Sequence, residues 1–268
     1  MSQRSTVWSE MQRHRIMTCV LESGVVDIRN VVAGEAPVPY TSRHFGPVYI
    51  GIKELIGWPL LDDLITFLAD KVRKELPCPV RFLVGTATGA IVPSYEIAKK
   101  LRRFWNRKGV PSGYVRDQAK NNEWLVGVRN NPLIQEGDSC LLIEELINFG
   151  ETTVRSVRVL REAGYKITHV ACFLWYENPC AIKALKREGL EVLYLFTLPQ
   201  LLDRAEKSGL YARELLDQCR EFLRDPIGWE HRHVATFPHS FMLILDDETG
   251  KPLGQAIFGH SSESDAHL

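Results

Sequence analysis

The feature that most constrains the fold of this chain is a regular alternation of short apolar runs and amphipathic segments from Pro47 onward. The apolar runs have the length and composition of strands, and the segments between them repeat their apolar residues at helical spacing. Strands are therefore predicted at 48–52, 80–85, 113–116, 139–145, 167–175 and 191–196, and helices at 59–76, 90–105, 151–163 and 179–188. This alternation favours an α/β fold, in which helices cover both faces of a mostly parallel sheet.

The two ends of the chain depart from this alternation. The patterns there predict a helix at 5–22, irregular chain at 25–46, a long helix at 199–223, irregular chain at 226–234, and a β-hairpin about the turn DDETGK at 241–258. We therefore expect an N-terminal helix with an irregular cap, an α/β core, and a C-terminal appendage of a helix and a small hairpin: 1–45, 46–210 and 211–268.

Composition and charge exclude several classes of protein. A chain of 268 residues that is 45% hydrophobic can bury a full core. Lys+Arg and Asp+Glu both number 33, so no net field draws the chain to nucleic acid or to a membrane. No apolar stretch is long enough to span a membrane, and the N-terminus lacks the apolar core of a signal peptide. The six cysteines are scattered without a CxxC pair, so we expect a reduced, cytoplasmic protein without a zinc site.

The stretch SCLLIEELINFGETTVRSVRVLREAG at 139–164 carries the main functional signal. An apolar strand ends in Glu144 and Glu145, and a loop containing Gly150 then leads into a helix. Ligands of open α/β sheets bind at the carboxyl ends of the strands, and helix N-termini favour phosphate. The carboxylates would repel a phosphate, but they can accept hydrogen bonds from a sugar diol. The stretch therefore predicts a site for ribose 5-phosphate.

The phosphate loop of this predicted site consists of Ile147, Asn148, Phe149, Gly150, Glu151, Thr152 and Thr153. A simpler interpretation stays open, in which the acids merely end a strand and Thr152 or Thr153 caps the following helix.

The segment LLIEELINFGETT resembles the signature of type I phosphoribosyltransferases that binds phosphoribosyl pyrophosphate (PRPP). The wider resemblance, over about residues 40–210, is to orotate phosphoribosyltransferases. VGTATGAIVP at 84–93 resembles the loop that wraps the pyrophosphate, and VRDQAKNNEWLVG at 115–127 resembles the mobile loop of that family. HFGPVYIGIKELIGWPLLDDL at 44–64 resembles its Ser-Pro-x-Tyr segment, which a basic residue follows, here Lys53.

The resemblance implies a type I phosphoribosyltransferase-like fold, a homodimer, and PRPP or a nucleoside monophosphate as ligand, with a nucleobase-like acceptor. It implies Mg²⁺ bound with PRPP and not directly by protein side chains. The residues that it implies for catalysis are Glu144, Glu145 and Lys120. Those that it implies for the pyrophosphate are Thr86, Ala87, Thr88, Gly89 and Arg116. Candidates for contact with the base are Trp175, Tyr176 and Lys53.

Several residues depart from the pattern of that family and leave two hypotheses open. Glu145 stands where the family has Asp, Asp117 replaces a Lys of the mobile loop, and Trp175-Tyr176 replaces an Asp-Arg pair whose Arg meets orotate. The first hypothesis is an enzyme that transfers phosphoribosyl groups, which Arg116 and the other retained charges favour. The second is a catalytically impaired module that senses PRPP or a nucleotide and acts through a protein partner at its termini.

Two further patterns have simpler explanations. His231 and His233 would face the same side of an extended segment and could share a metal, but no third ligand lies nearby in the sequence. The basic run RRFWNRK at 102–108 could touch nucleic acid, yet the solvated end of an amphipathic helix explains it better.

Overall fold

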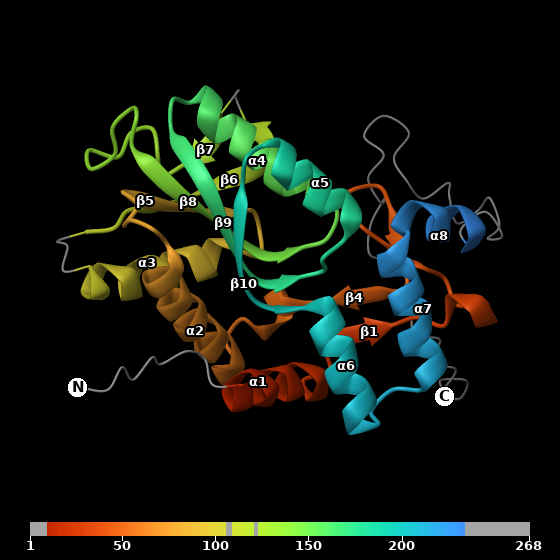
Figure 1. Ribbon diagram of the computed structural model, residues 1–268. Coiled ribbons are helices and arrows are strands. Elements are labelled where there is room, and N and C mark those ends of the chain that lie inside the picture. Colours follow the sequence, from red (N-terminus) through yellow and green to blue (C-terminus); the bar gives the residue numbers. More distant parts are fainter. Residues whose placement is uncertain (1–9, 106–108, 121–122, 234–268) are drawn as a thin grey trace, which may run out of the picture.

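The fold is built on one six-stranded sheet. The computed structural model describes residues 10–105, 109–120 and 123–233. The strands follow the order β10-β9-β8-β5-β6-β7 across the sheet, and each pairing is parallel except that of β7 with β6 (Figure 1). Their bounds are β5 Phe82–Thr86, β6 Ser112–Lys120, β7 Glu123–Val126, β8 Ser139–Ile147, β9 Lys166–Trp175 and β10 Glu191–Thr197. The predicted mostly parallel α/β sheet is confirmed.

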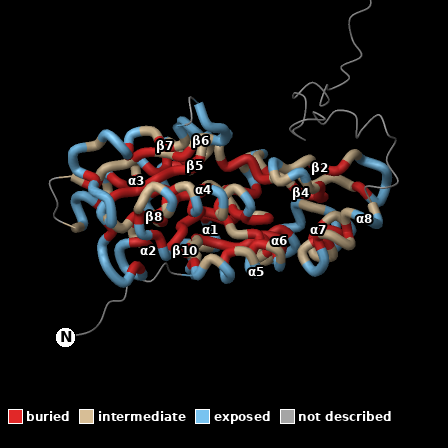
Figure 2. The backbone as a smooth tube through the Cα atoms, turned by 90° about the horizontal axis from the view of Figure 1, so that it is seen from above, coloured by how far each residue is buried: buried red, intermediate tan, exposed pale blue. Residues whose placement is uncertain are grey.

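Helices cover both faces of the sheet, as Figure 1 shows. One face carries α2 and α3 together with α1 and α6, and the other carries α4 and α5. The bounds are α1 Glu10–Glu22, α2 Pro59–Glu75, α3 Ile91–Phe104, α4 Glu151–Glu162, α5 Pro179–Arg187 and α6 Leu198–Ser208. The buried backbone runs through the middle of the molecule between these layers (Figure 2).

The alternation of side chains along β8 divides the interior into two apolar clusters. Leu141 and Ile143 belong to the cluster under α2 and α3, whereas Cys140 and Leu142 belong to the cluster under α4 and α5. Successive side chains of a strand point to opposite faces of the sheet, so a strand buried on both faces has to be apolar throughout. This explains why the sequence of β8 is a continuous apolar run.

The region 25–46, predicted to be irregular, forms several very short elements, and two more follow it at 48–55. Their bounds are β1 Val26–Ile28, η1 Val31–Ala33, β2 Val38–Pro39, β3 Phe45–Gly46, β4 Val48–Ile50 and η2 Ile52–Leu55. β4 pairs antiparallel with β1, with Val26 opposite Ile50, so the strand predicted at 48–52 lies outside the main sheet. Strands of two or three residues are too short to show the period-two alternation by which a strand is recognised.

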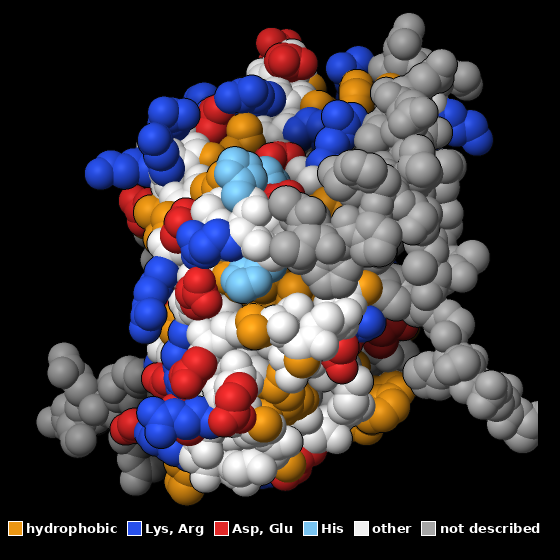
Figure 3. Space-filling model, turned by 90° about the vertical axis from the view of Figure 1, so that its right-hand side faces the viewer, with side chains coloured by type: hydrophobic (Ala, Val, Ile, Leu, Met, Phe, Trp, Pro, Cys, Tyr) orange, Lys and Arg blue, Asp and Glu red, His pale blue; other side chains and the backbone are white. Residues whose placement is uncertain are grey.

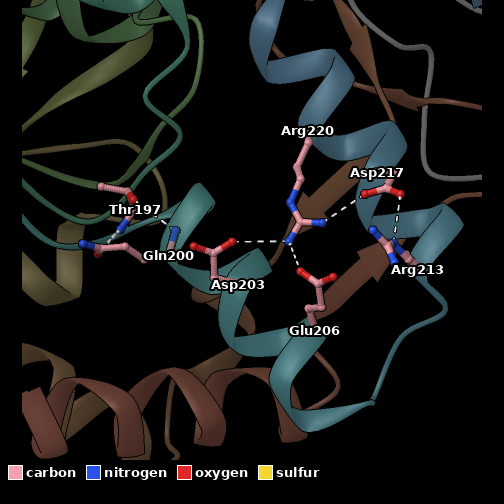
Figure 4. Close-up of polar contacts among 7 residues, drawn as sticks. All are labelled: Thr197, Gln200, Asp203, Glu206, Arg213, Asp217 and Arg220. Carbon is pink, nitrogen blue, oxygen red and sulfur yellow. Dashed lines mark hydrogen bonds and ion pairs between the residues drawn. The ribbon is translucent and has the colours of Figure 1, made fainter.

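The single helix predicted at 199–223 is wrong, because the chain forms two helices there. The helix α6 ends at Gly209, whose φ of 68° is left-handed, and α7 (Arg213–Arg224) follows. Arg220 of α7 donates hydrogen bonds to Asp203 and Glu206 of α6, at 3.3 and 2.6 Å (Figure 4). These contacts hold the two helices side by side.

The C-terminal part of the described chain is also more regular than predicted. Residues 226–233, predicted to be irregular, form the helix α8 (Pro226–His233), which buries Trp229. On a helix, residues two apart do not face the same side, so His231 and His233 do not form the pair that an extended segment would give. The described residues contain no group of His, Cys, Asp and Glu side chains that could hold a metal ion. The hairpin predicted at 241–258 lies outside the described residues.

The segment that resembles a mobile loop, 115–127, is mostly extended where the structure describes it. β6 and β7 form an antiparallel pair, with Val115 opposite Leu125. Arg116 and Lys120 therefore lie on one strand, which continues past the carboxyl end of its neighbour β5. Among the described helices, none is both long enough and apolar enough to cross a membrane.

Candidate functional site

The first acid of the pair, Glu144, is held inside the protein. Its carboxylate accepts hydrogen bonds from the hydroxyls of Thr86, at the end of β5, and Thr153, in the first turn of α4; the second is 2.8 Å long. Glu144 is 5% exposed. Burial raises its pKa to about 7, although the two hydroxyls act in the opposite direction. Glu144 therefore ties α4 to the sheet.

This contact rules out the simpler interpretation in which Thr153 caps α4. The N-cap is Gly150, and no side chain caps the helix in the described structure. The hydroxyl of Thr153 points back to Glu144 instead. The first N–H groups of α4 are consequently left for an anion at this end of the helix.

Replacing Glu144 with glutamine is expected to stabilise the protein at pH 8 while changing its stability little near pH 4.5. The pKa of Glu144 is about 7 in the folded protein against a usual 4.5, so the folded state binds this proton more tightly. The free energy of unfolding of the wild type therefore falls as pH rises from 4.5 through 7. Glutamine does not ionise, and the gain at pH 8 should be roughly 1–3 kcal/mol, since one pKa unit corresponds to about 1.4 kcal/mol.

Urea unfolding of both proteins between pH 4.5 and pH 8 measures this effect. Burial also raises the pKa of Glu145 to about 7, so Glu144 is followed through the difference between variant and wild type, which includes its interaction with Glu145. If the difference in the free energy of unfolding between variant and wild type stayed constant from pH 4.5 to pH 8, Glu144 would not have a raised pKa in the folded protein.

The second acid, Glu145, faces the opposite side of the sheet, as the alternation along β8 requires. It lies against the loop after β5, because a Cβ built on Gly89 would be 1.6 Å from Oε2 of Glu145. A side chain at position 89 would therefore push this carboxylate out of its present place. The Oε2 atom is buried and has no hydrogen-bond partner in the described part of the chain. Burial raises the pKa of Glu145 to about 7, and Lys53 partly opposes this rise.

The loop between β8 and α4 is fixed by side chains on both flanks. Asn148 accepts a hydrogen bond of 3.0 Å from Asn178, and Phe149 is buried. Gly150 adopts a left-handed φ of 80°, which turns the chain into α4 and which glycine adopts readily. The side chain of Glu151 is 57% exposed. The acid inside this loop is thus directed largely to solvent.

The basic residues of β6 are placed at different depths. Arg116 follows Val115, which is paired with Thr86 at the end of β5, so it emerges at the same edge of the sheet as the acids. Its guanidinium lies 5.9 Å from the ring of Tyr114, and its Nε has no partner among the described residues. Lys120 is exposed four residues further along the strand, about 13 Å away at the usual rise of a strand.

The three candidates for base contact lie in different environments. Tyr176 is 1% exposed and its hydroxyl lies 3.4 Å from the carbonyl of Val48, so its side chain packs in the core. Trp175 is half-buried and packs edge-on against Tyr194, with ring centroids 5.2 Å apart. Lys53 lies beside Tyr49 and Glu145, both of which raise its pKa.

His44 is a residue of this region that sequence reasoning missed. Its ring stacks on Phe149 of the loop, and its Nδ1 lies 2.8 Å from Oε2 of Glu230 on α8. The only local signal was its position as the first residue of the segment 44–64, which resembles the Ser-Pro-x-Tyr segment of the family. No sequence pattern could have paired it with an acid 186 residues away.

These features define a class of protein. An acid at the carboxyl end of a central parallel strand, followed by an uncapped helix N-terminus, is the arrangement by which open α/β sheets bind phosphorylated ligands. The chain belongs to the family of the phosphoribosyl transferase domain, whose sequence model matches residues 51–192. It is therefore a phosphoribosyltransferase-like protein, as the sequence predicted.

Known relatives agree with this assignment. The chain is 24% identical over 220 residues to the orotate phosphoribosyltransferase of Lactobacillus johnsonii, covering 82% of this chain and 97% of the relative. It is 27% identical to the enzyme of the same name from Ruegeria sp., covering 81% and 92%.

Solved structures share the fold. Orotate phosphoribosyltransferase from Aeropyrum pernix superposes with a TM-score of 0.55 at 21% identity, covering 74% of this chain and 99% of the other. Leishmania donovani UMP synthase has a TM-score of 0.61 at 21% identity, and the match covers 78% of this chain but 42% of that protein.

Proposed function

We propose that this protein transfers the phosphoribosyl group of PRPP to a nitrogenous base. The observation that carries the proposal is the contact of Glu145 with Gly89, because it joins the strand that leads into the phosphate loop to the loop assigned to the pyrophosphate. In the proposed complex the 5-phosphate binds at 147–153. The pyrophosphate binds at Thr86, Ala87, Thr88 and Gly89.

The two acids have different roles in this proposal. Glu144 accepts hydrogen bonds from two protein hydroxyls, so it mainly holds the site together. Glu145 has an oxygen without a partner in the described chain and is the acid that can accept from the sugar diol. Arg116 and Lys120 supply the positive charge for the pyrophosphate.

In the reaction, the bond from the anomeric carbon to the pyrophosphate oxygen breaks and its electron pair leaves with the pyrophosphate. The lone pair of a nitrogen of the base forms the new bond to that carbon. An N–H nitrogen releases its proton to solvent. The sugar is positively charged in between, and the carboxylate of Glu145 stabilises that charge. The protein otherwise acts by positioning the two reactants.

Mg²⁺ bound with PRPP fits these residues. Hard cations take oxygen ligands, Mg²⁺ usually keeps several waters, and the buried Oε2 of Glu145 is an oxygen in need of a partner. We propose that phosphate oxygens and water hold the ion and that Glu145 accepts from its water shell. When bound, the ion would neutralise charge on the leaving pyrophosphate.

The remaining proposals concern the assembly of the protein, its location and the division of the chain into segments. A homodimer is expected from the family resemblance and a cytoplasmic location from the composition, and a protein partner at the termini belongs to the alternative hypothesis of a sensor. The division into 1–45, 46–210 and 211–268 likewise stays a prediction, and one apolar cluster includes residues from all three segments, among them Val20 and Trp229.

Orotate is expected to be a poor acceptor or none. The family pairs an Arg with the orotate carboxylate, and this chain has Trp175 and Tyr176 there, the second of which is buried. A panel of bases with labelled PRPP and Mg²⁺, followed by chromatography for new nucleotides, measures the preference. Pyrophosphate release with orotate at 1 s⁻¹ or faster, a rate typical of enzymes, would refute the prediction. Binding of PRPP without product from any base would instead support a sensor.

A further inference from the structure

His44 packs against the phosphate loop, and both His44 and its partner Glu230 on α8 lie outside the residues matched by the family model. Its ring stacks on Phe149, with centroids 4.1 Å apart and an interplanar angle of 18°. Its Nδ1 lies 2.8 Å from Glu230 of α8, and its Nε2 lies 3.7 Å from Oε1 of Glu151 at the start of α4. The imidazole is therefore fixed on one side and directed at α4 on the other.

The charges around the ring favour its protonated form. The hydrogen bond to Glu230 raises the pKa of His44 most, burial opposes it, and the negative charges of Glu230 and Glu151 raise it further. The loop before α4 faces the ring with an apolar side chain, Phe149. A protonated imidazole donates from both nitrogens, so Nε2–H remains for a second acceptor. Figure 3 shows histidine side chains on the side of the molecule that lies to the right in Figure 1, with both acidic and basic side chains around them.

Glu151 occupies the place that such an acceptor would take. Its carboxylate stands at a helix N-terminus, where the helix dipole favours negative charge. The carboxylate is 3.7 Å from Nε2, longer than a hydrogen bond, and more than half of the side chain is exposed, so it can swing away. An anion with stronger acceptor oxygens, such as a phosphate monoester, would displace it.

We propose that His44, oriented by Glu230, is a binding residue for the phosphate monoester of the ligand, and that Glu151 covers this position until the phosphate displaces it. The inference rests on the proposed function, because it places the phosphate at the loop 147–153. It adds a cation from the N-terminal cap and makes α8 part of the site. The C-terminal segment is then linked to ligand binding through one carboxylate.

The test uses ribose 5-phosphate as the probe and isothermal titration of the full-length protein at pH 6 and pH 9. His44→Asn should weaken binding roughly tenfold at pH 6, the scale of one hydrogen bond to a charged group, and much less at pH 9. The ligand itself titrates near pH 6, so the ratio of wild-type to variant affinity is compared at each pH. His44→Lys should restore binding at both values, because lysine remains charged.

Two variants of the acids complete the design. In protein that carries Glu230→Gln, the pKa of His44 should be lower, so the affinity advantage of histidine over asparagine at position 44 should disappear at a lower pH. Glu151→Gln should tighten the binding of ribose 5-phosphate a few-fold, because it removes the competing carboxylate. A ratio that is the same at pH 6 and pH 9, or an unchanged affinity of His44→Asn, overturns the inference alone. Wild-type protein that does not bind ribose 5-phosphate overturns the proposed function together with it.

Discussion

Replacing Gly150 with aspartate is expected to abolish the thermal stabilisation that PRPP with Mg²⁺ confers on the wild type. Gly150 is the N-cap of α4, with a left-handed φ of 80°. An aspartate there places a negative side chain where we propose that the phosphate binds, and its Cβ would lie 3.3 Å from Cβ of Ala181. At a hundred times its Kd a ligand stabilises the folded state by about 2.7 kcal/mol. For a domain of this size that is roughly 5–10 °C in Tm, all of which should be lost.

Two control variants separate the charge from the backbone. Gly150→Asn has the same shape without the charge, and asparagine tolerates left-handed backbone, so part of the shift should remain. Gly189→Asp places the same side chain at another positive φ, 64°, where its Cβ would meet nothing within 4 Å. In Gly189→Asp, PRPP with Mg²⁺ should raise Tm as much as in the wild type. A full-sized shift in Gly150→Asp would show that the loop 147–153 does not bind the phosphate.

Replacing Glu145 with glutamine is expected to reduce product formation by about tenfold or more, a loss of about 1.4 kcal/mol of transition-state stabilisation. Binding of PRPP should stay within a few-fold of the wild type. The carboxylate matters most when the sugar becomes cationic, so its loss acts on turnover more than on the bound ground state. Glu145 is half-buried, its carboxylate lies against Gly89, and its buried Oε2 has no partner in the described chain, so glutamine, which has the same shape, fits the same space.

The matched control for this variant is Glu54→Gln. Glu54 is an exposed acid on η2 whose charge also acts on Glu145, so the control alters the local charge without touching the proposed contact. Turnover is measured with labelled PRPP and the base of the panel that gives the most product. Affinity for PRPP is measured by titration calorimetry. Equal losses of turnover in the two variants would argue for a general charge effect and against a specific role of Glu145.

Much of the core could be predicted because its signals are local. A strand such as β8 is buried on both faces and is therefore apolar over consecutive residues, and α4 shows its one buried face at helical spacing. The motif that joins them lies within a single stretch, 139–164, so the phosphate loop could be proposed before any long-range contact was known. The elements that sequence reasoning missed, such as β1 and α8, are short or interrupted.

The sequence by itself determined the alternation of strands and helices, the family resemblance, and the position of two acids and a glycine at the end of the central strand. Only the tertiary structure decided how the acids differ, because Thr86 reaches Glu144 across a strand pairing and Gly89 meets Glu145 across a loop. It also decided that His44 meets Glu230. Periodicity records which face of an element is buried, but it does not record which distant side chain lies against it, and that is set when the elements pack.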